Sequence, residues 1–334
     1  MKTKLFLHIG THKTGSTSVQ NFFCANDAAL LGAGIFYPDL ARVNAGHHRL
    51  AWCTGMGPRR PAALDKIAAW ISDLADIAAA AADIHSVVIS SEEFEYARNI
   101  EPLAQLREYF NVTVVVYLRR QDHYIESSYN QNVRVYDQRF SGSIYQFALQ
   151  NNLFNRFNYR WMLQPWEQIF GVDSIVVRPY GTPHVEPDVR IDFLQLIGAS
   201  RALAPPAAMQ RDTDNISLRC SALPYLARIN ELSLTPAQHN EVIAELNRQV
   251  PAAANARLLS APEIADFYSK FEQGNRYVFA RYMGLEEDPF SAAGQGDTPA
   301  THVDHDAIDR TLLLGVLHRL QLAPGITGAL APAG

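Results

Sequence analysis

The sequence contains few cysteines and no pattern that would pair them. Cys24, Cys53 and Cys220 lie far apart, and no two of them have the CxxC spacing. This argues against a disulfide framework and against a zinc site, and it is typical of a protein from a reducing compartment.

An excess of basic charge and long hydrophobic runs are also lacking. The formal net charge is −5, so no overall basic field indicates a nucleic-acid partner. No segment approaches the roughly 20 apolar residues that span a membrane. Met1 and Lys2 lead directly into a strand pattern, without the apolar core of a leader peptide. We therefore predict a cytoplasmic protein without a transmembrane segment.

The chain does contain apolar strand patterns that alternate with helical patterns. It has 334 residues, of which 48% are hydrophobic, so it can bury a sizeable core. Short apolar runs at residues 4–7, 86–90, 112–118 and 174–180 predict buried strands. Because helical patterns separate these runs, we predict an α/β protein with a central parallel sheet flanked by helices.

A glycine-containing loop follows the first predicted strand. Residues 8–20 read HIGTHKTGSTSVQ, and residues 18–24 have the pattern of a helix. A loop between a strand and a helix N-terminus can bind an anion, because its amides point at the anion and the helix dipole favours negative charge. The alternative is an ordinary strand–helix turn with a capping hydroxyl.

The lysine of this loop is displaced from its position in an ATP-binding P-loop. Gly10 and Gly15 match the two glycines of GxxxxGK[ST], and Thr17 matches the final hydroxyl residue. Ser16 stands where that motif has lysine, and Lys13 comes two residues before the second glycine. We expect the Lys13 ammonium to meet the anion from a different side.

Residues 13–18, KTGSTS, resemble the 5′-phosphosulfate loop of sulfotransferases that use 3′-phosphoadenosine 5′-phosphosulfate (PAPS). That resemblance implies a P-loop-type three-layer fold, a PAPS co-substrate and no required metal. It also implies that Lys13 stabilises the leaving phosphate oxygen. The nucleotide-binding residues that it implies in this loop are His12, Lys13, Thr14, Gly15, Ser16 and Thr17.

A second motif of the family binds the 3′-phosphate through an arginine after a central strand and a serine eight residues later. Arg119 and Ser127 have this spacing, and Tyr129 follows as the expected aromatic residue. Many relatives have Arg-Asp-Pro here, whereas this chain has Arg120 and Gln121 after Arg119. The alternative is a solvated strand end.

The resemblance extends over residues 4–285. Residues 211–217, RDTDNIS, resemble a late loop that closes over the nucleotide, although a plain solvated loop is an alternative. We predict a sulfotransferase-like P-loop domain over 1–285. Residues 286–334 are predicted to form a linker and a C-terminal tail with a possible helix.

Two sets of residues are candidates for the general base. Gly46, His47 and His48 resemble the Gly-His segment of uronyl-type sulfotransferases, in a stretch (residues 44–61) that we expect to be a surface loop. A histidine with a pKa near 6.5 can accept a proton near neutral pH. The rival is Glu92 or Glu93, which follow the strand at 86–90. The structural alternative for the histidines is that they are surface loop residues. For the glutamates it is that they are acidic residues at a helix N-terminus, favoured by the helix dipole.

The function that these motifs predict is sulfuryl transfer from PAPS to a hydroxyl, which we expect to belong to a carbohydrate. The predicted partner is thus a small-molecule or glycan acceptor. One alternative is a P-loop kinase that uses ATP and Mg²⁺. Two features argue against it: Lys13 is displaced, and the strand at 87–89 is followed by Ser-Ser-Glu instead of a metal-binding aspartate. Another is a nucleotide-binding protein that lacks a catalytic base.

Overall fold

The structure is a computed structural model. It describes residues 2–58, 60–81, 83–199, 203, 218–253, 255–292, 301–304, 308–320 and 322. The predicted nucleotide-closing loop at residues 211–217 lies outside these residues. Contacts divide the chain into two units: residues 1–120, 156–209 and 271–295 form the first, and residues 121–155, 210–270 and 296–334 form the second. Because the second unit takes segments from both sides of residue 285, the predicted boundary there stays a prediction.

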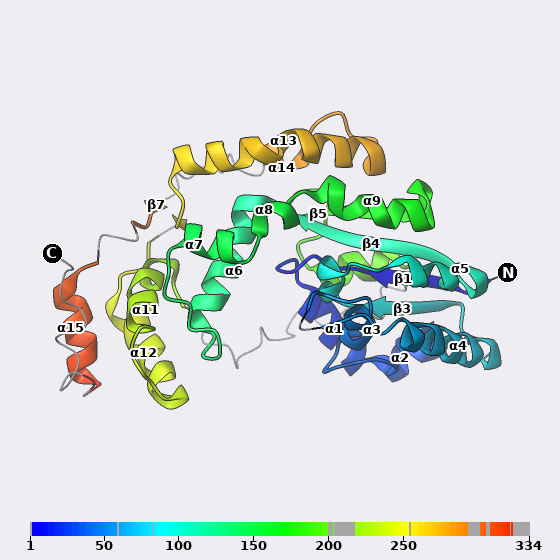
Figure 1. The fold of residues 1–334 in the computed structure, drawn as a ribbon, viewed down its shortest axis with the longest axis horizontal. Coiled ribbons are helices and arrows are strands. Elements are labelled where there is room, and N and C mark those ends of the chain that lie inside the picture. The colour runs from blue at the N-terminus through cyan, green and yellow to red at the C-terminus, as the bar shows by residue number, and fades with distance from the viewer. Residues whose placement is uncertain are drawn as a thin grey trace. The chain divides into compact units, whose positions relative to one another are not determined.

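The first unit contains a parallel sheet of five strands in the order β2-β3-β1-β4-β5 (Figure 1). The strands are β1 (Lys4–His8), β2 (Ile35–Phe36), β3 (Ser86–Ser90), β4 (Asn111–Arg119) and β5 (Ile175–Tyr180). β1 lies at the centre, paired with β3 and β4, and the parallel register brings the carboxyl ends of the strands to one edge. The predicted α/β class is confirmed.

Helices cover both faces of this sheet. They include α1 (Ser16–Ala25), α2 (Asp27–Gly32), α3 (His48–Cys53), α4 (Leu64–Ala80), α5 (Leu106–Tyr109), α9 (Tyr159–Phe170), α10 (Val189–Leu196) and α14 (Pro289–Ala292). Short 3-10 helices are η1 (Glu92–Tyr96), η2 (Glu101–Gln105) and η3 (Val172–Ser174). α9 packs against β4 and β5, whereas α1 and α10 pack against each other.

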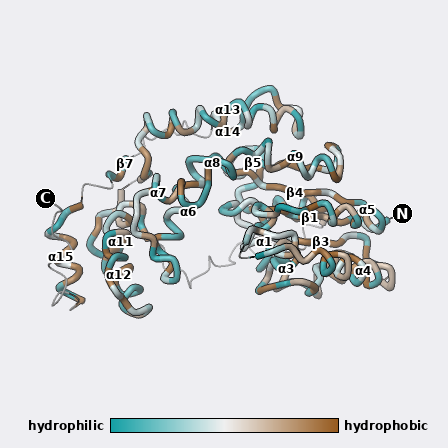
Figure 2. The backbone as a smooth tube through the Cα atoms, in the orientation of Figure 1, coloured by the Kyte–Doolittle hydropathy of each residue, from teal (hydrophilic) through white to brown (hydrophobic). Residues whose placement is uncertain are grey.

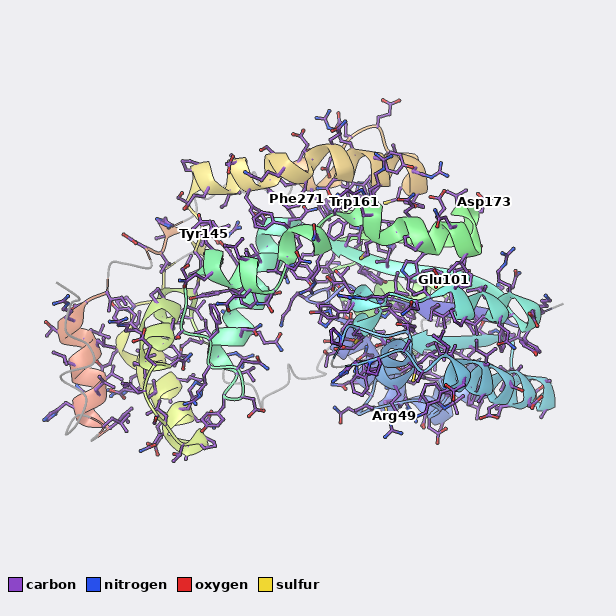
Figure 3. All side chains as sticks on the ribbon, in the orientation of Figure 1. Arg49, Glu101, Tyr145, Trp161, Asp173 and Phe271 are labelled. Carbon is purple, nitrogen blue, oxygen red and sulfur yellow. The ribbon has the colours of Figure 1, made fainter. Side chains whose placement is uncertain are left out.

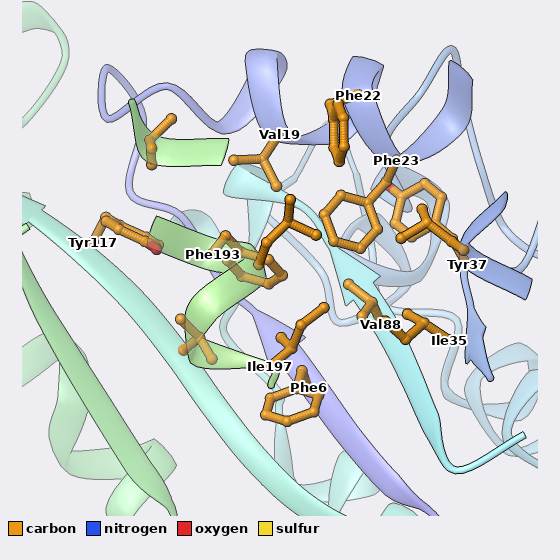
Figure 4. Close-up of a cluster of buried hydrophobic side chains, with 14 of the residues drawn as sticks. Phe6, Val19, Phe22, Phe23, Ile35, Tyr37, Val88, Tyr117, Phe193 and Ile197 are labelled. Carbon is orange, nitrogen blue, oxygen red and sulfur yellow. The ribbon is translucent and has the colours of Figure 1, made fainter. Parts of the chain in front are cut away.

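The core beneath α1 and α10 is aromatic. Phe22 and Phe23 of α1, Phe193 of α10 and Tyr117 of β4 belong to one buried cluster, and each is at most 2% exposed (Figure 4). The Phe193 ring lies next to those of Phe23 and Tyr117. Strand β4, whose hydrophobic residues are brown in Figure 2, is buried along most of its length because both faces of the sheet are covered. This packing fixes the start of α1, and therefore the loop that precedes it.

The second unit is helical. Its elements are α6 (Gln121–Arg134), α7 (Ile144–Gln150), α8 (Leu153–Arg156, whose last residue belongs to the first unit), η5 (Cys220–Ala222), α11 (Leu223–Ile229), α12 (Pro236–Gln249), β6 (Ala256–Arg257), β7 (Thr301–His302) and α15 (Arg310–Arg319). The long helix α13 (Ala261–Met283) has residues in both units. Within the second unit, Arg257 forms ion pairs with Asp122 (2.7 Å) and Glu126 (2.6 Å) of α6.

The prediction of a surface loop over residues 44–61 is wrong in part. Residues 48–53 form α3, and Leu50 and Ala51 on this helix are buried. The segment has little sequence periodicity because the helix is only six residues long. Its stability comes from tertiary packing, including contacts with η1 and α4.

Candidate active site

The loop between β1 and α1 has the backbone that its glycines predict. Gly10 has φ of 97° and Gly15 has φ of 83°, both in the left-handed region that favours glycine. A Cβ on Gly10 would lie 2.9 Å from Cα of Glu92, and one on Gly15 would lie 2.7 Å from a methyl carbon of Val189. Both glycines are therefore required by close packing as well as by backbone conformation.

The first backbone amides of α1 have no acceptor within the helix. The helix begins at Ser16, and its first hydrogen bond runs from the N–H of Val19 to the carbonyl of Gly15 at 3.2 Å. The helix ladder supplies no acceptor for the amides before Val19, so they and the helix dipole can bind an anion. The hydroxyls of Thr14 (2.6 Å) and Ser16 (3.1 Å) instead donate to the carbonyl of Thr11, inside the loop.

Arg119, from the second sequence motif, contacts the loop that forms the first. Its Nη1 donates a hydrogen bond to the carbonyl oxygen of Lys13 at 2.6 Å, and its guanidinium lies 5.7 Å from the ring centre of Tyr180. The structure therefore brings Arg119 to the loop between β1 and α1. Ser127 lies on α6 in the second unit, so its predicted contact with the 3′-phosphate stays a prediction.

His12 is turned away from the amides and towards η1. Its backbone N–H (3.0 Å) and its Nδ1 (2.8 Å) both bind Glu95, its Nε2 lies 3.6 Å from Glu93, and Arg156 also pairs with Glu95. Burial opposes the charged imidazole, but hydrogen bonds to the two carboxylates outweigh it and raise the pKa of His12 to about 9. His12 therefore fastens the loop to η1 as a cation, and its predicted contact with the nucleotide stays a prediction.

His47 is fully buried, and both of its ring nitrogens are occupied. Nδ1 accepts the N–H of Ser90 at 3.1 Å, and Nε2 lies 2.9 Å from the carbonyl of Pro38. Burial lowers the pKa of His47 to about 3. No nitrogen is left to accept a substrate proton, so the geometry disfavours His47 as the base.

His48 has one free nitrogen. Its Nδ1 lies 2.8 Å from Oγ of Ser91, and its ring stacks on Trp52 with centroids 6.0 Å apart. A Cβ on Gly46 would lie 2.6 Å from Nε2, so glycine is required there for the ring to fit. In the part of the chain that the structure describes, Nε2 of His48 has no hydrogen-bond partner.

Glu92, the rival base, lies close to His48. Its Oε2 accepts a 2.6 Å hydrogen bond from Nε2 of Gln20, a buried residue of α1. Oε1 of Gln20 lies 2.9 Å from the Cβ position of Gly46, the same point that lies 2.6 Å from Nε2 of His48. Gln20 therefore sits between the two candidate bases. The sequence reasoning missed it, and the available signal was a polar residue on the apolar face of α1.

A cavity of about 800 Å³ opens at the carboxyl end of β5. Side chains that line it include Arg178, Tyr180, Thr182, His184, Glu186 and Asp192. Tyr180 also reaches the loop between β1 and α1, since its ring lies 3.9 Å from the Cβ position of Gly15. The cavity wall is ordered by Asp192, which accepts hydrogen bonds from Tyr117 (2.7 Å) and from Nε of Arg178 (3.0 Å).

Comparison with known proteins gives few matches. No family model matches the sequence. An uncharacterized protein from Archaeoglobus fulgidus is 31% identical over 208 residues, which are 60% of this chain and 54% of that protein. The chain thus spans about half the length of this relative. Among solved structures, a sulfotransferase from Alicyclobacillus acidocaldarius aligns with a TM-score of 0.41 and 14% identity, over 69% of this chain and 93% of the other.

Two further observations concern the described residues. None of their helices combines the length and the apolar character needed to cross a bilayer. They also contain no group of three or more histidine, cysteine, aspartate or glutamate side chains placed to hold a metal ion.

Proposed function

We propose that this protein is a PAPS-dependent sulfotransferase that transfers the sulfuryl group to a hydroxyl, most simply that of a carbohydrate. The observation that carries this proposal is the contact of Arg119 with Lys13. It joins the arginine motif to a phosphate loop whose lysine precedes its second glycine.

The residues at the site fit the anionic groups of PAPS. The free amides of α1 and the Lys13 side chain suit a 5′-phosphosulfate. The guanidinium of Arg119 has five N–H donors in a planar fork, which suits a phosphate such as the 3′-phosphate. The cavity beside Tyr180 is within the roughly 300–1,000 Å³ of ordinary ligand sites, so it can take the nucleoside.

Each residue then has a defined task in the transfer. The Lys13 ammonium and the α1 amides stabilise the negative charge that grows on the departing phosphate oxygen. The transfer needs a base for the hydroxyl proton, and the neighbouring residues His48 and Glu92 are the candidates for this part of the reaction. The loop and the cavity hold the donor in position for in-line attack.

Calorimetry separates this proposal from the kinase alternative. We expect the protein to bind adenosine 3′,5′-bisphosphate more tightly than ATP with Mg²⁺, and Lys13→Ala and Arg119→Ala to weaken that binding. Arg49→Ala is a matched control, because Arg49 is exposed on α3 next to His48 (Figure 3). Tight binding of ATP without binding of the bisphosphate would overturn the proposal. Transfer of labelled sulfate from PAPS to members of a glycan panel then identifies the acceptor.

A further inference from the structure

The hydroxyl of Ser91 fixes which nitrogen of His48 bears a proton. Ser91 is fully buried, and its Oγ already accepts the N–H of Glu93 at 3.3 Å. A buried hydroxyl hydrogen that is left without an acceptor destabilises the folded protein. Among the described residues, the acceptor within reach of that hydrogen is Nδ1 of His48 at 2.8 Å. The hydrogen bond therefore runs from Ser91 to His48.

The direction of this bond makes Nε2 of His48 a donor. When Nδ1 accepts a hydrogen bond, a neutral imidazole must bear its proton on Nε2. Nε2 is the nitrogen that faces Gly46 and has no partner in the described part of the chain. Neutral His48 can therefore donate a hydrogen bond to a bound molecule, but it has no free nitrogen with which to take a proton.

Ser91 makes His48 a hydrogen-bond donor, whereas Gln20 leaves Glu92 able to accept a proton. A carboxylate only accepts hydrogen bonds, so the amide nitrogen of Gln20 must face Oε2 of Glu92, at 2.6 Å. The same nitrogen lies 3.3 Å from Oγ of Ser90, whose own hydrogen is then directed to Nδ1 of His8 at 2.8 Å. Oε1 of Glu92 has no partner among the described residues, and it is left to accept a proton.

We propose that Ser91 and Gln20 are positioning residues that give the two neighbouring candidates opposite roles, His48 as hydrogen-bond donor and Glu92 as proton acceptor. The division of roles rests on the proposed sulfuryl transfer. In that reaction the acceptor oxygen forms a bond to sulfur. The bond between sulfur and the 5′-phosphate oxygen breaks, and its electron pair stays on the phosphate. The hydroxyl proton of the acceptor passes to Oε1 of Glu92, while Nε2–H of His48 holds the acceptor.

Nitrogen-15 NMR of the histidine rings tests the tautomer without nucleotide or acceptor. His48 is assigned by the signals that disappear in His48→Asn, and the spectra are recorded where the ring is neutral. We expect a non-protonated Nδ1 and a protonated Nε2 in the wild type and in Ser91→Thr, which keeps the hydroxyl. In Ser91→Ala we expect the two tautomers to mix. A proton on Nδ1 in the wild type, or unchanged signals in Ser91→Ala, would overturn the proposal.

Kinetics with the acceptor found in the glycan panel test the roles. His48→Gln keeps an N–H donor and should retain clearly more turnover than His48→Ala, whereas Glu92→Gln should lose about 100-fold or more in kcat. Gln20→Leu should lower kcat with little change in the Kd of adenosine bisphosphate. Equal loss in His48→Gln and His48→Ala, or full activity of Glu92→Gln, would refute the division of roles. Failure of the wild type to bind the bisphosphate would instead refute the proposed function, and the tautomer measurement would be unaffected.

Discussion

Arg119 donates a 2.6 Å hydrogen bond to the carbonyl of Lys13, and this contact joins two parts of the chain that are 106 positions apart in sequence. Arg119 ends β4 and Lys13 follows β1, and these neighbouring parallel strands place both residues at the same edge of the sheet. The Arg119 guanidinium thus holds the backbone of Lys13, which has a left-handed φ of 65°.

Arg119→Ala should weaken binding of adenosine 3′,5′-bisphosphate by about 10- to 100-fold, because hydrogen bonds to charged groups contribute roughly 1.5–3 kcal/mol. Arg119→Lys should recover only part of the affinity, since an ammonium cannot bind the carbonyl and a phosphate through a planar fork. Calorimetry of both variants beside Arg49→Ala measures this. Wild-type affinity in Arg119→Ala would contradict the assignment.

Lys13→Ala should reduce kcat more than it reduces nucleotide affinity. Negative charge on the leaving oxygen grows as the sulfur–oxygen bond breaks, so an ammonium beside it stabilises the transition state more than the bound donor. Loss of one such donor costs about 100- to 1,000-fold in kcat. Single-turnover rates and bisphosphate Kd values for Lys13→Ala and Lys13→Arg separate the two quantities. Equal losses of kcat and affinity in Lys13→Ala would argue for a binding role alone.

The sequence predicted the features that depend on local pattern. A strand, two glycines and a helix start were sufficient to predict the strand–loop–helix arrangement, and parallel pairing was sufficient to place Arg119 near the loop. Anion binding by this loop stays a prediction. Glycine spacing and strand ends are properties of single segments, so they can be recognised without knowledge of tertiary contacts.

The contacts of the candidate bases could not be predicted in this way. His47 and His48 are adjacent in sequence, yet both ring nitrogens of the first are bonded in the core, whereas Nε2 of the second has no partner among the described residues. The difference arises from Ser90 and Ser91, which are more than 40 positions away and are brought into contact only by folding. Gln20 was overlooked because helix periodicity indicates which face is buried, but not which polar partner it meets there.

Substitution of the two adjacent histidines should therefore affect different properties, mainly stability for His47 and mainly turnover for His48. His47→Ala removes two buried hydrogen bonds and leaves the N–H of Ser90 without an acceptor, so it should lower the free energy of unfolding by about 2–4 kcal/mol. His48→Ala removes the acceptor of the Ser91 hydroxyl, so it should cost less stability than His47→Ala, and it should lower turnover. Urea denaturation and sulfate-transfer rates of the two variants test this contrast. A stable, inactive His47→Ala protein would restore His47 as a catalytic candidate.

The pH dependence of stability tests the cluster around His12. Its folded-state pKa of about 9 lies above the unfolded value of 6.5, so folding favours the protonated imidazole. The resulting stabilisation is fully present below about pH 6.5 and is lost as the pH rises through about 9. Because Glu93, Glu95 and Arg156 surround the ring, His12→Gln keeps a hydrogen-bond donor there but removes the titrating charge.

The difference in unfolding free energy between wild type and His12→Gln should shrink by about 3 kcal/mol at most across this pH window. Urea denaturation at several pH values measures it, with His318→Gln, exposed on α15, as the control. A difference that stays constant from pH 6 to pH 10 would show that His12 is not held as a cation. In that case a neutral His12 would hold the loop to η1 through its hydrogen bonds to Glu95, and this anchoring would not weaken in alkaline solution.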